Sequence, residues 1–404
     1  MTKPLLLQQP NLLRFWLGQT GAFMAYNMLV VAVGWQVYDL TNSAFSLGLV
    51  GLIQFLPQLL LTLLVGHVAD RYDRRYISLI CQWVKMVMAA VLAIGSFTHS
   101  LTVETIFICA AVIGAARAFE IPSMQAMLPL LVPMEMLPRA IAAAAGGREL
   151  AVILGPAVGG FIYVFGADKV YLLGALTFFL AGIAIIGIRA PIRAPRPAGS
   201  GKLAAVLGGI SYIKGRPVIL GAISLDLFSV LLGGATALLP IYARDILMTG
   251  PWGLGLLRAA PAVGAISMSL LLARRPLQSR VGITMMSAVA GFGVATIVFG
   301  LSRWFPLSFL ALICLGATDM ISVVTRQSLV QLETPDEMRG RVAAVNSIFI
   351  GASNQLGEFE SGATAALIGV VPAVVIGGVG TLVVVVLWTV FFPALAKRDR
   401  LIQA

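Results

Sequence analysis

Charged residues are scarce in this chain of 404 residues: Asp, Glu, Lys and Arg together make up 11% of it, while hydrophobic residues make up 59%. A soluble domain carries about 25% charged residues, which keep its surface in contact with water. The scarcity excludes an ordinary soluble protein. It predicts an all-α integral membrane protein, most of whose surface faces lipid.

Histidine and cysteine are also nearly absent. The chain has only His67 and His99, and its three cysteines, Cys81, Cys109 and Cys314, all lie inside apolar runs without a CxxC pair. This usage excludes a disulfide framework and indicates no metal site. We therefore expect neither a metal nor another cofactor.

A complete phosphate-binding loop is missing as well. The fragment GSGK at 199–202 is followed by Leu203, and Arg196 stands where the motif needs its first glycine. ATP hydrolysis is therefore unsupported, and we do not expect an enzyme. The energy for any active transport would have to come from an ion gradient.

Long apolar windows are abundant, and each is long enough to cross about 30 Å of hydrocarbon as a helix. Six windows fall in the first half of the chain, near residues 12–39, 45–66, 77–98, 103–131, 140–164 and 169–188. Six more fall in the second half, near 217–241, 252–273, 281–301, 305–330, 343–368 and 370–393. The sequence thus predicts twelve transmembrane helices.

The two sets of six are separated by RAPIRAPRPAGSGK, residues 189–202, whose prolines, glycines and cations suit a solvated connection. We expect a six-helix bundle over 1–188, a cytoplasmic linker over 189–215 and a second six-helix bundle over 216–404. The stretch LAAVLGGISYIKG within the linker could form a short amphipathic helix on the membrane surface.

Cations are distributed very unevenly over the predicted loops. If both termini are cytoplasmic, nearly all loop lysines and arginines fall on the cytoplasmic side, and the other side holds only Lys169, Arg244 and Arg303. Positive charge marks the cytoplasmic face, so a multi-pass membrane protein with both termini in the cytoplasm is expected. The net charge of +11 then reflects topology and attraction to anionic lipid, and no nucleic-acid partner is needed to explain it.

An internal repeat relates the two halves. Shifting the chain by 202 residues aligns 114–160 with 316–362 without a gap, and the matched positions include Gly114 with Gly316, Gly155 with Gly357 and Gly160 with Gly362. Internal repeats are typical of transporters, whose similar halves can expose one central site to either side of the bilayer in turn. The repeat therefore predicts a transporter built from two pseudo-symmetric bundles.

The loop after the second window, GHVADRYDRR at 66–75, resembles the signature loop of the major facilitator superfamily, G-x-x-x-D-R-x-G-R-R. The residues that match are Gly66, Asp70, Arg71, Arg74 and Arg75. We expect them to form a cytoplasmic latch, with an acid near a helix N-terminus and an arginine partner. Asp73 replaces the second glycine of the motif, which puts a tight turn there in doubt. The equivalent segment 273–280 keeps the cations but has no acid, so the latch should be asymmetric.

A glycine and proline pattern occurs in the fifth window: Gly146, eight residues, then Gly155, Pro156, Ala157, Val158, Gly159 and Gly160. It resembles the motif associated with antiporters of the same superfamily, and it is also compatible with plain helix packing. Proline removes a backbone hydrogen bond and kinks the helix, while glycines allow a partner helix to approach. The pattern favours an exporter.

Charged residues inside the windows are costly in lipid and usually mark a functional path. Those expected near the midplane are Arg117, Glu120, Asp226, Asp319, Arg326, Glu358 and Glu360. Arg117 and Glu120 share a helical face and could pair, as could Asp319 and Arg326. The repeat matches Arg117 with Asp319, so one half carries a cation where the other carries an acid.

Acids in such surroundings can carry protons, and our preferred carriers are Asp226, Glu358 and Asp319, in that order. Glu358 and Glu360 are about 200° apart on a helix, so at most one should face a central cavity. Lys85 is interpreted as a structural residue near a helix end, where its ammonium group can reach water. Arg258 could pair with Glu360 or meet an anionic substrate.

The strings TPDEMRGRV at 334–342 and LDLFSVLLGGATALLPIYARDIL at 225–247 are similar to those of the exporters grouped with the enterobactin efflux proteins. The resemblance extends over nearly the whole chain. It implies the major facilitator fold with twelve helices, an inner (plasma) membrane location and proton-coupled export of small amphipathic molecules, such as siderophores or drug-like compounds. Separately, we expect the protein to be a monomer. An importer or facilitator of the same fold and a lipid flippase remain alternatives, and a receptor is disfavoured by the short loops.

Overall fold

The computed structural model describes residues 9–188, 202–275, 277 and 279–400, with only the backbone described at 62–64, 66, 67, 69, 70 and 202–206. Its first six long helices are α1 (Pro10–Thr41), α2 (Ala44–Arg71), α3 (Arg74–Phe97), α4 (Val103–Met127), α5 (Leu137–Tyr163) and α6 (Ala167–Ile186). The later ones are α7 (Lys202–Lys214), α8 (Pro217–Leu232), α10 (Gly250–Arg274), α11 (Val281–Leu301), α12 (Phe305–Glu333), α13 (Asp336–Ile368) and α14 (Val370–Phe391). The described residues contain helices but no strand, which confirms the predicted all-α class.

Eleven spans in the described chain are long and apolar enough to cross a membrane. The predicted eleventh window corresponds to α13, which has 33 residues but is too polar to count among them. Asn346, Asn354, Gln355, Glu358 and Glu360 interrupt its apolar run. Polar side chains in a helix of this length usually face other protein groups or a water-filled cavity, because lipid cannot satisfy them.

The seventh window, near 217–241, is confirmed as a candidate membrane span, Pro217–Ile246, but it is not one unbroken helix. Helix α8 ends at Leu232, and the chain continues as short turns through η4 (Ala235–Leu238), α9 (Leu239–Ile241) and η5 (Tyr242–Ile246). The interruption lies at Gly233 and Gly234, where a Cβ on Gly234 would meet the backbone of Gly357 at 2.5 Å. Glycine is needed there because the backbone of α13 leaves no room for a side chain.

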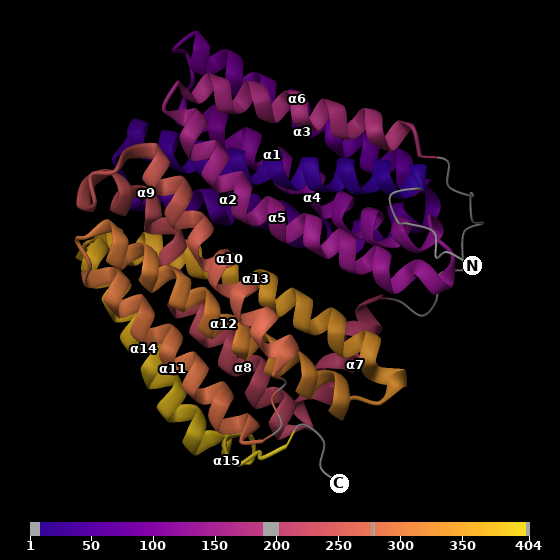
Figure 1. The fold of residues 1–404 in the computed structure, drawn as a ribbon, viewed down its shortest axis with the longest axis vertical. Helices are drawn as coiled ribbons and strands as arrows, with labels where there is room; N and C mark the ends of the chain where they lie inside the picture. The colour runs from indigo at the N-terminus through magenta and orange to yellow at the C-terminus, as the bar shows by residue number, and fades with distance from the viewer. Residues whose placement is uncertain (1–8, 189–201, 276, 278, 401–404) are drawn as a thin grey trace. The chain divides into compact units, whose positions relative to one another are not determined.

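The contacts group the chain into two units. The first contains Met1–Asn42, Ile53–Ala198 and Thr249–Ala259, and the second contains Ser43–Leu52, Gly199–Met248 and Ala260–Ala404. In the first unit, α3 packs on α6 and α4, while α1 packs on α5 and α6. In the second, α11 packs on α12 and α14, while α8 packs on α13 and α14 (Figure 1).

Glycines allow equivalent helices to approach closely in each unit. In the first, Gly114 of α4 lies against the backbone of Gln54 in α2, and in the second, Gly316 of α12 lies against Pro261 in α10. Likewise, Gly160 of α5 meets Gly255 of α10, and Gly362 of α13 meets Gly48 of α2. Small residues at such contacts let helices pack tightly in lipid. The same glycine contacts recur in both units, in agreement with the internal repeat.

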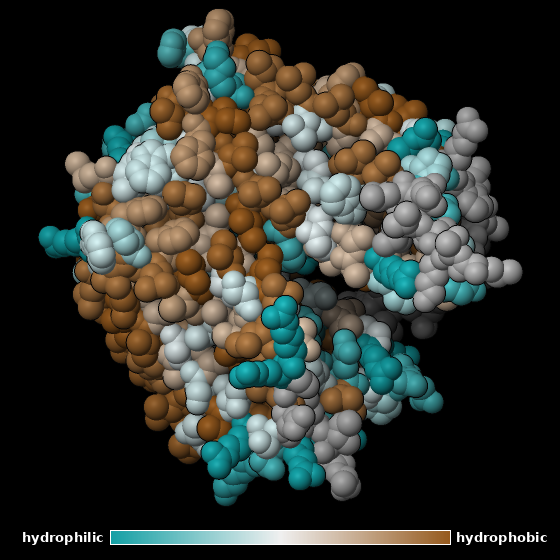
Figure 2. Space-filling view, in the orientation of Figure 1, coloured by the Kyte–Doolittle hydropathy of each residue, from teal (hydrophilic) through white to brown (hydrophobic). Residues whose placement is uncertain are grey.

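The outer surface is largely apolar. Figure 2 shows hydrophobic side chains covering the face formed by α11 and α14. Val390 of α14 is 70% exposed, and Ile376, Val386 and Ile283 are also exposed. In water such a surface would drive association, but in a bilayer it is the surface that lipid covers.

Helix α7 was predicted to lie as an amphipathic helix on the membrane surface. One of its faces is occupied by protein, because Ile213 is buried with Val342 and Val345 of α13. The Tyr212 hydroxyl also donates to the carbonyl of Glu333, at 3.1 Å. Residues 189–201 of the predicted linker lie outside the described residues.

The C-terminal segment closes one end of the second unit. Its short helix α15 (Pro393–Ala396) buries Leu395 completely, and the carbonyls of Asp399 and Arg398 accept from the N–H groups of Val281 and Gly282. The Asp399 carboxylate accepts from the N–H of Arg280 at 3.0 Å. A helix N-terminus has N–H groups without acceptors in the helix, and here the chain terminus supplies them.

Candidate functional site

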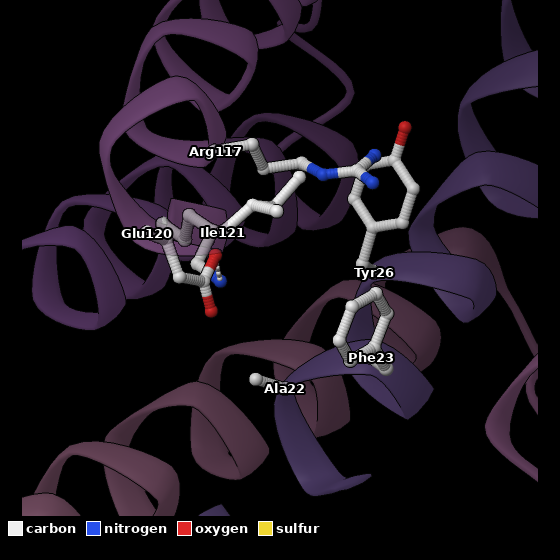
Figure 3. Close-up of a pocket in the computed structure, with 7 residues that line it drawn as sticks. Ala22, Phe23, Tyr26, Arg117, Glu120 and Ile121 are labelled. Carbon is white, nitrogen blue, oxygen red and sulfur yellow. Dashed lines mark hydrogen bonds and ion pairs between the residues drawn. The ribbon is translucent and has the colours of Figure 1, made fainter. Parts of the chain in front are cut away.

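The first unit contains a small pocket between α1, α3 and α4. It is lined by Ala22, Phe23, Tyr26, Lys85, Arg117, Glu120 and Ile121. Figure 3 shows that α4 contributes its charged residues and α1 contributes aromatic ones. The pocket thus combines an apolar wall with a cluster of charges in the middle of the helices.

Glu120 is held by partners on α3 and does not pair with Arg117. The Lys85 ammonium lies 2.6 Å from Glu120 Oε2, and Gln82 Nε2 donates to Oε1, also at 2.6 Å. Lys85 is only 1% exposed, so its interpretation as a residue that reaches water near a helix end is wrong. Its ammonium cannot reach water from the middle of α3, and it is stabilised by the buried acid instead.

Arg117 lies directly against the ring of Tyr26 (Figure 3). Its guanidinium carbon is 3.5 Å from the ring centroid, and the Tyr26 hydroxyl donates to Gln54 Oε1 at 2.8 Å. Within the described parts of the chain, the Arg117 side chain makes no hydrogen bond or ion pair. The aromatic face is its main partner, an attraction of about 0.5–2 kcal/mol.

The second unit contains a pocket of the same size. It is lined by Asp226, Ser229, Val230, Val289, Phe292, Asp319 and Ser322, from α8, α11 and α12. The Ser322 hydroxyl is buried and has no hydrogen-bond partner among the described residues. Its lining differs from that of the first pocket in carrying acids and hydroxyls.

Arg326 joins this pocket to α13. Its guanidinium lies 3.1 Å from Asp226 Oδ2 and donates to Asn346 Oδ1 at 2.9 Å, and the side chain is 2% exposed. Arg326 therefore pairs with Asp226 and not with Asp319, the partner suggested by sequence spacing. Asp319 has no hydrogen bond or ion pair with the residues that the structure describes.

The two pockets occupy repeat-equivalent places. The shift of 202 residues matches Arg117 with Asp319 and Glu120 with Ser322, and each of these residues lines the pocket of its own unit. In ionised form, the first pocket holds two cations and one acid. The second holds two acids beside the single cation of Arg326. The first pocket therefore has an excess positive charge and the second an excess negative charge. From the sequence repeat, such opposite charges were expected only for Arg117 and Asp319.

The two glutamates of α13 line neither pocket. Glu358 lies over Gly51 of α2 within the second unit, where a Cβ on the glycine would be 2.7 Å from its Oε2 atom. Glu360 accepts from the hydroxyl of Thr364, one turn later, at 2.8 Å. No cluster of three or more potential metal ligands occurs in the described part of the chain.

Comparison with known proteins identifies the family. A family model described as transmembrane secretion effector, a branch of the major facilitator superfamily, matches residues 6–401. The chain belongs to this family. This confirms both the predicted fold class and the resemblance to the major facilitator superfamily.

Individual relatives agree with this assignment. The enterobactin exporter EntS of Escherichia coli is 23% identical over 384 residues, which cover 95% of this chain and 92% of the exporter. Macrolide efflux protein A of Streptococcus pyogenes is 27% identical over 177 residues, so the match spans only 44% of either chain.

Solved structures share the fold. A bacterial homologue of the human lysosomal transporter Spinster has a TM-score of 0.73 at 15% identity, with 96% of both chains covered. A variant of the nucleoside transporter NupG has a TM-score of 0.75 at 13% identity, with 95% of this chain and all of that chain covered. The family and its structural neighbours are transporters, and none of these relatives is an enzyme.

The signature loop of the superfamily can be described only in part. Only the backbone of Gly66 and Asp70 is described, and Arg71 is exposed. Arg74 donates to the carbonyl of Ala126 at 3.1 Å, and Arg75 donates to that of Ile188 at 2.7 Å. Both arginines thus cover the C-terminal ends of helices, where cations are favoured.

The doubt about Asp73 is resolved by the backbone. Asp73 has φ −63° and ψ 121°, values open to any residue, and its carboxylate accepts from the N–H of Arg75 at 2.8 Å. It is the N-cap of α3, a position that favours aspartate. No glycine is needed here.

The glycines of α5 have different surroundings. Gly155 and Gly159 face α1, where a Cβ would lie 2.6 Å from the Cβ of Asn27 and 2.9 Å from the Cα of Met28, respectively. Gly160 faces α10, and Gly146 has open space around it. Pro156 is buried within the helix, which continues on both sides of it. Three of the four glycines are therefore packing residues.

Proposed function

We propose that the protein is a proton-coupled exporter of small amphipathic organic molecules in a bacterial inner membrane. It would act as a monomer with both termini in the cytoplasm. Its two bundles, 1–188 and 216–404, would rock about a central site, and the motif at Gly66 to Arg75 would latch the cytoplasmic side. The observation that carries this proposal is the opposite excess charge of two pockets at repeat-equivalent positions.

The acidic pocket is suited to carry a proton. Asp226 is ion-paired with Arg326, whereas Asp319 faces the same pocket without a cation of its own. A single proton bound by the two acids would cancel the excess charge, which is costly in the low dielectric of the membrane. Asp319, the third of the carriers preferred from the sequence, is therefore the first proposed proton carrier. Asp226 is its neighbour in a coupled pair.

The direction of transport is supported by the relatives. One is an enterobactin exporter and another a macrolide efflux protein, and both names describe outward movement of the named molecules. The glycine and proline pattern from Gly146 to Gly160 is compatible with the same direction. We take siderophores and drug-like amphiphiles as the first substrates to test.

Asp319→Asn is expected to reduce pH-driven transport by about tenfold or more, since the amide cannot release a proton. The measurement is flux of enterobactin and of a macrolide antibiotic in inverted proteoliposomes under an imposed pH gradient. Asp336→Asn is the matched control, because Asp336 is an exposed acid of the same unit that pairs with Arg339. It should transport like the wild type.

Three results would contradict the proposal. The first is pH-driven flux of neither compound by the wild type, and the second is equal flux in Asp319→Asn. The third is flux driven by a sodium gradient at uniform pH. Uptake in the opposite direction would favour an importer, and movement of a labelled phospholipid instead of both compounds would favour a flippase.

A further inference from the structure

We infer that the pocket of the first unit is a subsite for the anionic group of the substrate, so that the substrate is an organic anion with a flat apolar body. This inference deepens the proposed function and rests on it. It depends on Arg117, whose position in the pocket is shown in Figure 3. The partners of Arg117, the charges around it and the lining of the pocket each support the assignment.

Arg117 offers hydrogen bonds that the protein does not use. A guanidinium has five N–H donors in a planar fork, and within the described residues none of them meets an acceptor. Tyr26 covers the plane of the guanidinium at 3.5 Å but cannot accept along its edges. A half-buried guanidinium without protein acceptors is costly in a membrane bundle, so its hydrogen bonds must be accepted by water or by a ligand.

The nearest acid is already engaged. Both carboxylate oxygens of Glu120 are bonded, one to Lys85 and the other to Gln82, each at 2.6 Å. Glu120 therefore compensates Lys85 and leaves the charge of Arg117 in excess. An anionic ligand would supply that missing charge, and a carboxylate could accept two parallel bonds from the guanidinium edge.

The rest of the lining is apolar or aromatic. Ala22, Phe23 and Ile121 face the pocket beside Tyr26. Binding pockets typically combine such a wall with a few polar groups that fix the orientation of the ligand. The pocket therefore fits an aromatic or amphiphilic acid better than a neutral or cationic amphiphile.

The test compares two probes of nearly the same shape, the anion 9-anthracenecarboxylate and its neutral primary amide. Their binding to the full-length protein in lipid nanodiscs is measured by fluorescence, with empty nanodiscs subtracted. The wild type should bind the carboxylate about tenfold or more tightly than the amide, the usual effect of a charge-assisted pair in a partly desolvated site. In Arg117→Gln, affinity for the carboxylate should fall to that for the amide.

Two further variants separate charge recognition from a folding defect. Arg117→Lys keeps the charge but lacks the fork, so it should keep part of the preference for the carboxylate. Arg139→Gln removes an exposed arginine of the same unit and should leave the preference unchanged. Melting temperatures of all variants are compared with that of the wild type.

Equal affinity of the wild type for both probes would overturn the inference. So would no measurable binding of the carboxylate at millimolar concentration, or an unchanged preference in Arg117→Gln. Because binding needs no gradient, the result is separable from the proposed function. If Arg117→Gln loses the preference for the carboxylate but the wild type shows no pH-driven flux, the subsite is supported and proton coupling is contradicted. If the wild type shows pH-driven flux but no preference for the carboxylate, proton coupling is supported and the subsite is contradicted.

Discussion

Arg326→Met is expected to lower the free energy of unfolding by about 3–5 kcal/mol, the typical cost of removing one partner from a buried ion pair. Arg326 is 2% exposed, and its guanidinium contacts both Asp226 and Asn346. Without it, Asp226 and Asp319 would face one pocket with no cation between them. The loss should appear as a lower melting temperature of the purified protein and as a smaller folded yield.

A second substitution tests the cause of that loss. Arg326→Met combined with Asp226→Asn should recover part of the lost stability, because one uncompensated acid is then removed. Arg339→Met serves as the control, since Arg339 is exposed and its pair with Asp336 is worth about 0–1 kcal/mol. Wild-type stability in the single variant, or no recovery in the double variant, would contradict the assignment of the pair.

Lys85→Met should destabilise the first unit by a similar amount, about 3–5 kcal/mol, because Glu120 would be left buried with only Gln82 as a partner. The methionine has nearly the volume of the lysine, so the cost comes from the charge and not from a cavity. The measurement is denaturant or thermal unfolding of the variant in the same detergent as the wild type.

A double variant tests whether the loss comes from the Lys85–Glu120 ion pair or from poor packing of the methionine. Lys85→Met together with Glu120→Gln should be more stable than Lys85→Met alone, with a coupling energy of about 1–3 kcal/mol. If Arg117, one turn away from Glu120 on α4, can replace the lysine, the single variant will lose less than about 1 kcal/mol. That outcome would contradict the division of roles in which Lys85 neutralises Glu120 and Arg117 binds the substrate.

The fold could be predicted from the sequence because it follows from local composition. The length of the apolar windows and the shift of 202 residues require no knowledge of which helices touch. The break at Gly233 was missed because apolar residues continue through it and only the packing of Gly234 on α13 requires glycine there. The sequence does contain a signal for it, namely two adjacent glycines followed by Pro240.

Apart from Lys85, the charged residues that line the pockets were singled out from the sequence, but their partners were not. Arguments from spacing consider neighbours on one helix and therefore suggested Arg117 with Glu120 and Asp319 with Arg326. The structure instead pairs Glu120 with Lys85 of α3 and Arg326 with Asp226 of α8, across helices. A carboxylate that can reach a cation on a facing helix pairs with it, and sequence spacing cannot reveal which helix faces it. The depth of Lys85, near the middle of a helix of 24 residues, could have marked it as a buried charge.

Proton release on substrate binding tests the proposed coupling most directly. In weakly buffered detergent solution with a pH indicator, binding of whichever compound is transported should release about one proton per protein, because substrate and proton exclude each other in an antiporter. Asp319→Asn should bind the compound and release none, while Asp336→Asn should release as much as the wild type. Equal release by Asp319→Asn and the wild type would contradict the role of Asp319, and binding by the wild type without any release would contradict proton exchange itself.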